Sequence, residues 1–415
     1  MTVDDVDVDY LDASAWGEGA HDRMRWLRQH APVYRAQKSD LWVVSKYEDI
    51  VGISKDPETF CSGQGIRPGI PVRQALIDED DPKHCRLRHA VNRGFTPRRV
   101  KLLEEKFEAI TRDAIDAVAG IGHCDFVEAI AVPLPLILIA EMIGIPNRDH
   151  RRFHAWSDAM MRADGHYDDE EIMARAGRAA LEYSVYIKEI IEARRREPQE
   201  DLISSLVAAD DEGLIARFDL DPDAAAVGMD REEFLELAND ELVMVLVTLM
   251  VAGNETTRNA LSGAVEMLIR NPGIRDRLVA KPELIPDAVE ELLRHVSPVH
   301  AFARTATRDT ELRGQAIREG EKVLMLYPSA NRDEEVFDRP DEIRIDRRPD
   351  HLAFGIGHHY CMGANLARME LRVALREILR RMPDLRFADA GPVVEPHALV
   401  RSCTRMEIEF TKEDR

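Results

Sequence analysis

The sequence predicts a mainly α-helical fold with a smaller β region, built as a single domain over residues 1–415. Helices are indicated where apolar residues recur every three or four positions, which holds for the stretches 100–119, 170–195, 232–270 and 365–381. Strands are indicated by short apolar runs near the two ends of the chain, at 33–34, 41–45, 322–326 and 406–410. No stretch reads as an interdomain linker, since the Pro- and Gly-bearing segment 64–71 and the acidic segment 208–230 are only loop-sized interruptions.

The composition is that of a soluble globular protein with a large core. Hydrophobic residues make up 45% and charged residues 32% of the chain, and 77 acidic residues against 56 basic ones give a formal charge of -21. This acidic balance disfavours nucleic acid or an anionic membrane as a partner of the whole molecule.

Nothing in the sequence directs the chain out of the cytoplasm. Residues 1–16 are acidic and lack the basic flank and apolar core of a signal peptide. The longest apolar run, 242–252, is well short of the roughly 20 residues that a bilayer span requires. The cysteines are odd in number, scattered and without a Cys-x-x-Cys pair, so they indicate neither a disulfide framework nor a zinc site. We therefore expect a cytoplasmic protein with no membrane anchor.

One cysteine, Cys361, stands in a position that changes its chemistry. It follows a loop with two glycines, Gly355 and Gly357, and precedes a helix that begins near Ala364. Backbone N–H groups in such a loop and at a helix N-terminus stabilise negative charge, so we expect the thiol to be held as thiolate, the form that binds metals. The glycines let the backbone pass close to a flat ring and let its amides point at the sulfur. Taken alone, a cysteine in a loop is more often structural than catalytic.

The segment 354–363 resembles the signature of the cytochrome P450 family. That signature reads Phe, Gly, any, Gly, any, His, any, Cys, any, Gly, and it is met at Phe354, Gly355, Gly357, His359, Cys361 and Gly363. The resemblance implies the cytochrome P450 fold, a single two-lobed domain that encloses haem b, iron protoporphyrin IX. It also implies that Cys361 is the axial ligand of the iron, that Phe354 packs against this cysteine and that His359 lies near a haem propionate. A thiolate on haem iron donates electron density that favours cleavage of dioxygen, the co-substrate.

A buried haem needs basic groups beside its two propionates, because unpaired buried carboxylates are costly. The segment 81–88 resembles the His-x-x-x-Arg helix of the family and puts His84 and Arg88 on one face, four residues apart. Arg304 matches another propionate partner. Each of these residues alone would more often be a surface charge, but together with His359 they form a set.

A further match is the Glu-x-x-Arg pair of the family. Glu291 and Arg294 stand three residues apart in a predicted helix, 287–295, and so share a face on which an ion pair can form. Most such pairs are solvated surface pairs of little energetic value. With Arg347, which the resemblance adds, we interpret them as a structural network behind the haem pocket. Ile343 departs from the family, which usually has phenylalanine at that position.

The long helix predicted around 240–269 carries polar groups into an apolar core. Its run 242–252 ends at Gly253, and Glu255 and Thr256 follow while the helical periodicity continues. Because Gly253 weakens helical hydrogen bonding, we expect a widened turn in which a threonine hydroxyl bonds backbone or water. By resemblance, Glu255 and Thr256 are the catalytic acid and alcohol that relay protons. Glutamate stands here where the family more often has aspartate.

The resemblance also assigns the walls of a substrate pocket. They are the mostly aliphatic residues Ile66, Leu76, Val247, Val251, Ala252, Val299, Ala301, Leu399 and Val400. An apolar pocket selects a hydrophobic molecule by burial. His300, Arg67 and Arg401 could supply polar anchors or could equally face solvent. Residues 252–259 and 77–100 look most like soluble actinobacterial members that hydroxylate steroids, terpenoids or branched lipids. A steroid-like lipid is therefore the first hypothesis, and smaller terpenoids or xenobiotics are the alternatives.

Electrons must come from another protein, because the chain has no nucleotide or flavin fingerprint; Gly355 and Gly357 follow no core strand. A small acidic ferredoxin with its reductase is the expected partner, and we expect the enzyme to be a monomer. Basic residues that could steer the ferredoxin cluster on and after the His84 helix, at Lys83, Arg86, Arg93, Arg98, Arg99 and Lys101. The alternative is an ordinary solvated helix face.

Three functions remain open from the sequence. The leading hypothesis is a monooxygenase that inserts one oxygen atom from dioxygen into a hydrophobic small molecule. A peroxide-driven haem enzyme is the second, although such enzymes usually lack an acid and alcohol pair like Glu255 and Thr256. A haem-binding sensor or carrier is the third, and it gives no reason for the match over several separate motifs.

Overall fold

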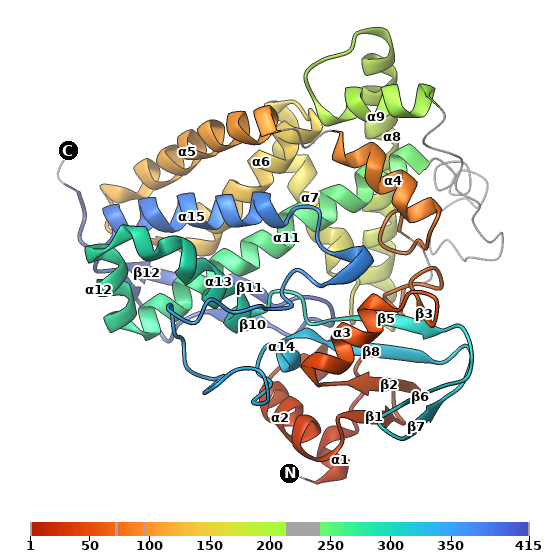
Figure 1. The fold of residues 1–415 in the computed structure, drawn as a ribbon. Helices are drawn as coiled ribbons and strands as arrows, with labels where there is room; N and C mark the ends of the chain where they lie inside the picture. The colour runs from red at the N-terminus through yellow and green to blue at the C-terminus, as the bar shows by residue number, and fades with distance from the viewer. Residues whose placement is uncertain (1, 71–73, 94–96, 213–240, 414–415) are drawn as a thin grey trace.

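The structure is a computed structural model that describes residues 2–70, 74–93, 97–212 and 241–413 of the chain. Helices make up most of the described chain and strands a smaller part, so the predicted mainly α fold with a small β region is confirmed. Figure 1 shows the long helix α11 (Glu241–Arg270) crossing the helical part, with the largest sheet on one side of it and the N-terminus beside that sheet.

The helices account for the periodic stretches of the sequence. The longer ones are α2 (Ala20–His30), α3 (Tyr47–Lys55), α4 (Lys83–Asn92), α5 (Pro97–Ala119), α6 (Pro133–Ile143), α7 (His150–Met161), α8 (Glu170–Arg196), α9 (Leu202–Asp211), α11, α12 (Pro272–Ala280), α13 (Ile285–Val296) and α15 (Ala364–Arg381). Short helical turns are α1 (Val3–Val6), η1 (Ala13–Trp16), η2 (Val127–Ala131), η3 (Asn147–Asp149), η4 (Pro282–Leu284), α14 (Tyr327–Ala330) and η5 (Gly357–His359). The helices predicted at 100–119, 170–195 and 365–381 are confirmed as α5, α8 and α15, and the described part of 232–270 is α11.

The strands join the two ends of the chain. The largest sheet has the order β1 (Val33–Ala36), β2 (Leu41–Val44), β8 (Lys322–Leu326), β5 (Ala301–Ala306) and β3 (Phe60–Cys61), with β2 and β8 parallel and the other neighbours antiparallel. Smaller sheets pair β4 (His123–Asp125) with β12 (Glu407–Glu409) and β9 (Arg386–Phe387), β10 (Val393–Glu395) with β11 (Ser402–Arg405), and β6 (Thr310–Leu312) with β7 (Gln315–Ile317). The predicted strand segments are confirmed, because they coincide with β1, β2, β8 and β12.

The main hydrophobic core surrounds α11, which packs against α6, α7, α8, α13 and α15. Two glycines allow this close packing: a Cβ at Gly253 would lie 2.8 Å from Ile139 of α6, and one at Gly263 would lie 2.6 Å from Val296 of α13. α11 runs through Gly253 as regular α-helix, so the widened turn predicted there is wrong. The missing side chain at Gly253 lets α6 approach and does not loosen the helix.

The largest sheet separates two smaller cores. Because side chains alternate in direction along a strand, Ala301 and Ala303 of β5 face a cluster with α2 and the N-terminal segment. Phe302 and Ala306 face the opposite cluster, which includes α3. Arg304 falls on this second face by the same alternation.

Among the described helices, none combines the length and the apolar character needed to cross a bilayer.

Candidate functional site

The loop that carries Cys361 leads directly into α15. It is closed by the Cys361 N–H, which donates to the Phe354 carbonyl at 2.9 Å. Gly355 and Gly357 have φ angles of 66° and 76°, in the left-handed region that glycine adopts without strain. α15 begins at Ala364, so the cysteine stands just ahead of the first helical turn, as the sequence predicted.

The Cys361 thiol is exposed, yet the surrounding protein raises its pKa by desolvation. The Gly363 N–H and the guanidinium groups of Arg88 and Arg368 lower the pKa without cancelling the effect of burial. The thiolate predicted from the sequence is the form that a metal cation on this sulfur would stabilise, because a coordinating thiol loses its proton.

Basic side chains from separate parts of the chain converge beside this loop. The His359 Nε2 atom lies 3.0 Å from the Ser62 hydroxyl, and the His359 ring centroid lies 4.2 Å from that of His84 on α4. His84 is only 3% exposed. Arg88, one turn further along α4, donates to the Tyr360 carbonyl at 2.7 Å. The two residues at four-residue spacing thus face the cysteine loop together.

Arg304 adds a buried cation to the same place. Its guanidinium donates to the Ala303 carbonyl at 2.8 Å, and no carboxylate among the described residues forms an ion pair with it. Burial, followed by repulsion from Arg304 and then from His84 and Arg88, lowers the pKa of His359 to about 2. Basic groups that repel one another in a buried place are stabilised when carboxylates bind between them.

On α11 the predicted acid and alcohol point in different directions. The Thr256 hydroxyl donates to the carbonyl of Ala252 at 2.8 Å, and Ala252 is exposed. Glu255 is 2% exposed, pairs with Arg258 and accepts a hydrogen bond from Asn254 at 3.3 Å. Burial raises the pKa of Glu255 to about 7, although Arg258 opposes the shift. Such a carboxyl can hold a proton at neutral pH, which an ordinary glutamate does not.

Glu291 and Arg294 form an ion pair whose two side chains are 0% exposed, with an N–O distance of 2.8 Å. Arg294 also donates to the carbonyls of Asn331 and Pro340, at 2.7 and 2.9 Å. Arg347 donates to Glu291 at 3.1 Å. The three residues that the sequence grouped are therefore joined in one network, which ties α13 to the segment after α14.

Comparison with known proteins shows which family has this arrangement. A family model of cytochrome P450 matches residues 150–383, more than half of the chain. The steroid C26-monooxygenase of Mycolicibacterium smegmatis is 38% identical to it over 98% of this chain and 96% of the relative. The chain belongs to the cytochrome P450 family. This P450 is a haem-thiolate monooxygenase, an enzyme that uses haem iron and dioxygen.

Other relatives differ in what their names say they oxidise. Nocardicin C N-oxygenase of Nocardia uniformis is 38% identical over 87% of this chain and 88% of its own. Among solved structures, CYP109E1 from Bacillus megaterium in complex with testosterone has a TM-score of 0.82 and 31% identity, covering 94% of this P450 and 98% of that chain. CalO2 has a TM-score of 0.84 and 30% identity, covering 98% and 99%.

The residues around Cys361 fit a haem. The Cys361 sulfur needs a cation to become a thiolate, and no carboxylate among the described residues forms an ion pair with the buried guanidinium of Arg304. A haem brings both, since its iron suits a thiolate and its propionates suit basic side chains. Cys361 and Arg304 would therefore each have a partner on the cofactor.

The predicted pocket residues lie mostly in and beside the main core. Leu76, Val247, Val251 and Val400 are buried in it, Val299 and Leu399 pack against it, Ile66 is buried and Ala252 is exposed. A bridge between Val299 and Val400 joins two of the predicted wall segments. Ala301 is the exception, because it lies in the cluster with α2, on the face of β5 opposite Arg304. The sequence alone did not show in which direction each side chain of β5 points.

The three polar side chains considered as substrate anchors are all engaged with other residues. Arg67 forms an ion pair with the fully buried Asp164 at 3.0 Å. His300 stacks on Trp16, with ring centroids 4.8 Å apart and planes 8° from parallel. Arg401 pairs with a glutamate of α11. In this structure these side chains hold loops and helices together and do not project into solvent.

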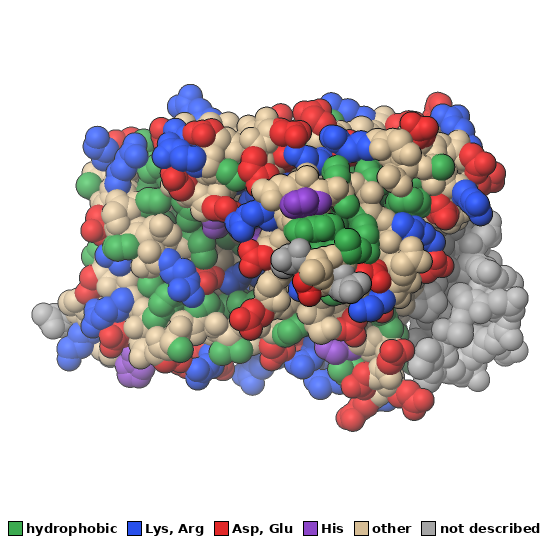
Figure 2. Space-filling view, turned by 90° about the horizontal axis from the view of Figure 1, so that it is seen from below, with side chains coloured by type: hydrophobic (Ala, Val, Ile, Leu, Met, Phe, Trp, Pro, Cys, Tyr) green, Lys and Arg blue, Asp and Glu red, His purple; other side chains and the backbone are tan. Residues whose placement is uncertain are grey.

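The basic residues on and after α4 are largely matched by acids from other elements. Lys83 and Arg86 lie 3.1 and 3.4 Å from Glu241 of α11, and Arg93 lies 2.7 Å from a glutamate beyond α9. The side chains of Arg98 and Arg99 lie outside the described residues, and Lys101 is exposed. Figure 2 shows acidic and basic side chains similarly interspersed over another face. The sequence could not reveal this compensation, because α11 supplies the acid from far along the chain.

Two supports of the cysteine loop were missed at the level of sequence. Ser62 lies beside β3 and contacts His359. No motif in the sequence marked this serine as part of the site. Arg368 lies over the Phe354 ring at 4.5 Å and donates to the Tyr360 hydroxyl at 2.9 Å. Its place about two helical turns after the cysteine was a usable signal, because that spacing returns a side chain to the same face.

The two loop glycines give a matched prediction. A Cβ at Gly357 would lie 2.4 Å from the Ser54 carbonyl oxygen, whereas the nearest atom to one at Gly355 is 3.8 Å away. Replacing either glycine by alanine places an alanine in the left-handed φ region, which destabilises the fold by about 1 kcal/mol. We expect Gly355→Ala to be mildly destabilising and Gly357→Ala to lose most of its haem. Haem content per chain and the thermal midpoint measure this, and equal behaviour of the two variants would contradict the packing argument.

Proposed function

We propose that this P450 hydroxylates a steroid or steroid-like lipid, with haem b bound through Cys361. The observation that carries the proposal is the gathering of His84, Arg88, Arg304 and His359 beside an exposed cysteine sulfur. The substrate class is supported by two similar proteins, one named a steroid C26-monooxygenase and the other solved with testosterone.

Cys361 would hold the iron, and the four basic residues would hold the two propionates. Gly355 and Gly363 would bring backbone close to the ring and the sulfur, and Phe354 would shield the iron–sulfur bond from one side. The Gly363 N–H already acts on the Cys361 sulfur. A hydrogen bond to a ligating sulfur tunes the potential of the iron, so this amide would belong to the site. Glu291, Arg294 and Arg347 would keep the supporting segment in place.

An apolar pocket would select the substrate by burial. Val247, Val251 and Ala252 on α11 would form one wall, and Val299 and the segment around Val400 another. A steroid skeleton is almost wholly apolar, so its removal from water contributes roughly 25 cal/mol per Å² of buried surface. Few polar groups are needed to bind it. The polar side chains nearby, Arg67 and Arg401, already form ion pairs with acidic residues of the protein. Selectivity would therefore come from shape more than from hydrogen bonds.

When bound, haem with a thiolate ligand supplies the cleavage of dioxygen and the insertion of one oxygen atom into substrate. The protein must deliver protons to that place and exclude bulk water. Glu255, with a pKa of about 7, can hold a proton inside α11. Thr256 stands on the exposed side of the helix, where its hydroxyl can pass a proton on. The relay requires the Glu255 carboxyl to leave Arg258 and turn toward Thr256.

The remaining assignments follow from the family and the chain together. A small acidic ferredoxin with its reductase would supply electrons, because neither flavin nor nucleotide has a binding fingerprint in the sequence. All five cysteines are free, which suits the reducing cytoplasm. The whole chain, residues 1–415, would act as one domain and as a monomer.

Spectral titration tests the substrate class. The purified enzyme is titrated with a panel of a steroid, a terpene and a fatty acid, while the absorption of the haem is followed. We expect the steroid to displace iron-bound solvent at the lowest concentration, and product analysis with ferredoxin and reductase to show its hydroxylation. Tighter binding and turnover of the terpene or the fatty acid would overturn the steroid assignment.

For Thr256→Ala we expect reductant to be consumed at a similar rate while most of it ends as hydrogen peroxide. The reason is that loss of the hydroxyl interrupts proton delivery after electrons have already arrived. Product, peroxide and reductant consumed are measured together. Thr257→Ser, at a buried neighbouring position, is the matched control and should stay coupled. A fully coupled Thr256→Ala variant would count against the relay, and activity with peroxide alone would favour a peroxide-driven enzyme.

A further inference from the structure

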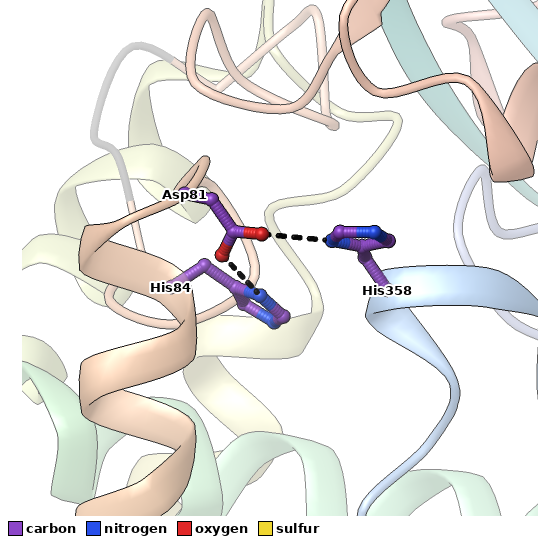
Figure 3. Close-up of side chains that lie close together, drawn as sticks. All are labelled: Asp81, His84 and His358. Carbon is purple, nitrogen blue, oxygen red and sulfur yellow. Dashed lines mark ion pairs between the residues drawn. The ribbon is translucent and has the colours of Figure 1, made fainter.

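A second cluster of ligand-type side chains lies next to the basic residues, on their outer side. Asp81, just before α4, and His84 on it meet His358 of η5, and Figure 3 shows the carboxylate between the two imidazoles. One potential ligand atom from each residue lies within 4.8 Å of the other two. No other group of three such residues meets this distance within the part of the chain that the structure describes.

The distances within the cluster suit a small metal cation. The Asp81 carboxylate oxygens lie 3.0 Å from the Nδ1 atom of His358 and 3.6 Å from the Nδ1 atom of His84. Zinc binds nitrogen and oxygen at about 2.0–2.2 Å, so two ligands of a tetrahedral site are about 3.4 Å apart. The two measured separations, which involve the two different oxygens of the carboxylate, lie on either side of this value. The three ligand atoms lie within 4.8 Å of one another, so side-chain rotation would have to bring them closer before they form three corners of a tetrahedron.

The His84 Nδ1 atom gives an independent reason to place a ligand here. His84 is 3% exposed, and this nitrogen is buried without a hydrogen-bond partner. Its separation of 3.6 Å from Asp81 is too long for a hydrogen bond. Burial, followed by repulsion from Arg88, lowers the pKa of His84, so the ring is neutral at neutral pH. A buried polar atom left unpaired is costly, and neutral imidazole is the form that binds metals.

A simple ion pair explains only part of the arrangement. It accounts for Asp81 with His358, whose side chains are 39% and 44% exposed, but leaves the buried Nδ1 atom of His84 without a hydrogen bond. The carboxylate is already fixed in place, because the Cys85 N–H donates to it at 3.1 Å. Hydrogen bonds from Cys85 also lower the pKa of Asp81, which keeps it ionised. An oriented carboxylate with its own hydrogen-bond donor is the usual support of a metal site.

We propose that Asp81, His84 and His358 bind a divalent transition-metal cation of the zinc type, with solvent completing its coordination. The site is separate from the haem iron and uses no cysteine. It takes the Nδ1 atom of His84 and leaves the Nε2 atom of the same ring available for a second partner. The cation would tie α4 to the cysteine loop, two segments that are otherwise far apart in the chain.

The test is a calorimetric titration of the holoenzyme with Zn²⁺ after treatment with a chelator. We expect one saturable site in the wild type. His358→Ala removes an exposed ligand without touching His84, and it should weaken binding at least tenfold, as should Asp81→Asn. His89→Ala is the matched control, because His89 is an exposed histidine on the same helix outside the cluster, and it should bind Zn²⁺ like the wild type.

A second measurement separates this site from surface binding and from the haem. Zn²⁺ should raise the thermal midpoint of the wild type and of His89→Ala but not that of His358→Ala, because binding to the folded state stabilises it. The haem spectrum of each variant, recorded alongside, reports on Cys361 and not on this cluster. The proposal is overturned when the wild type shows no saturable site, or when His358→Ala binds Zn²⁺ as tightly as the wild type does.

Discussion

Replacement of Cys361 by serine is expected to reduce steroid hydroxylation to the rate measured without enzyme, even when ferredoxin and reductase are in excess. Serine is close to cysteine in size, so the loop can keep its fold, but its oxygen donates far less electron density to iron than a thiolate does. Product formation per chain measures the effect. The variant should also lose the thiolate-type absorption of the reduced, carbon monoxide-bound form.

Cys124→Ser is the matched control for this loss. Cys124 lies on β4, in the sheet with β9 and β12, and this strand packs against α5 and η2. We expect it to keep the activity and spectrum of the wild type. Substantial hydroxylation by the Cys361→Ser protein would mean that another side chain ligates the iron.

Glu291→Gln should destabilise the fold by about 3–5 kcal/mol, the cost of breaking a buried ion pair by removing one partner. The Glu291 carboxylate accepts hydrogen bonds from the side chain of Arg294, the backbone N–H of Arg344 and the side chain of Arg347, at 2.8 to 3.1 Å. An amide has one acceptor oxygen and adds donors where only donors are present. Two guanidinium groups would lose their counter-charge in the interior. Thermal and denaturant unfolding of the holoenzyme measure the loss.

Asp287→Asn, on the same helix, is the matched carboxyl-to-amide change at the surface. Its pair with Arg348 has side-chain exposures of 38% and 78%, so the change should cost less than about 1 kcal/mol. If the two variants unfold at the same midpoint, the network around Glu291 is not the structural support that its geometry suggests. The same conclusion would follow if the Glu291→Gln protein kept its haem and unfolded with wild-type stability.

Much of the fold could be predicted because its signals are local. The helical period runs through α5, α8 and α15 without interruption, and short apolar runs mark β1, β2, β8 and β12. The widened turn at Gly253 was predicted wrongly, since a glycine inside a helix looks the same whether it loosens the turn or admits a neighbour such as Ile139. Only the position of α6 decides between these two.

The residues of the functional site also divide into those that the sequence could predict and those that it could not. Cys361 and the pairs His84 with Arg88 and Glu291 with Arg294 could be named from local spacing, and the family resemblance added the distant residues Arg304 and Arg347. Partners that neither a short motif nor the resemblance marks could not be named. These partners are Glu241, which forms an ion pair with Lys83, Asp164, which pairs with Arg67, and Arg258, which pairs with Glu255. Which face a strand residue such as Ala301 occupies is likewise fixed by tertiary packing.

The absorption spectrum of the purified, reduced enzyme under carbon monoxide tests the central claim most directly. Sulfur ligation predicts a strong band at the long wavelength typical of a thiolate on haem iron, with one haem per chain. A protein that carries no porphyrin, or one whose band lies where nitrogen-ligated haem absorbs, would contradict the assignment of Cys361 and the function built on it.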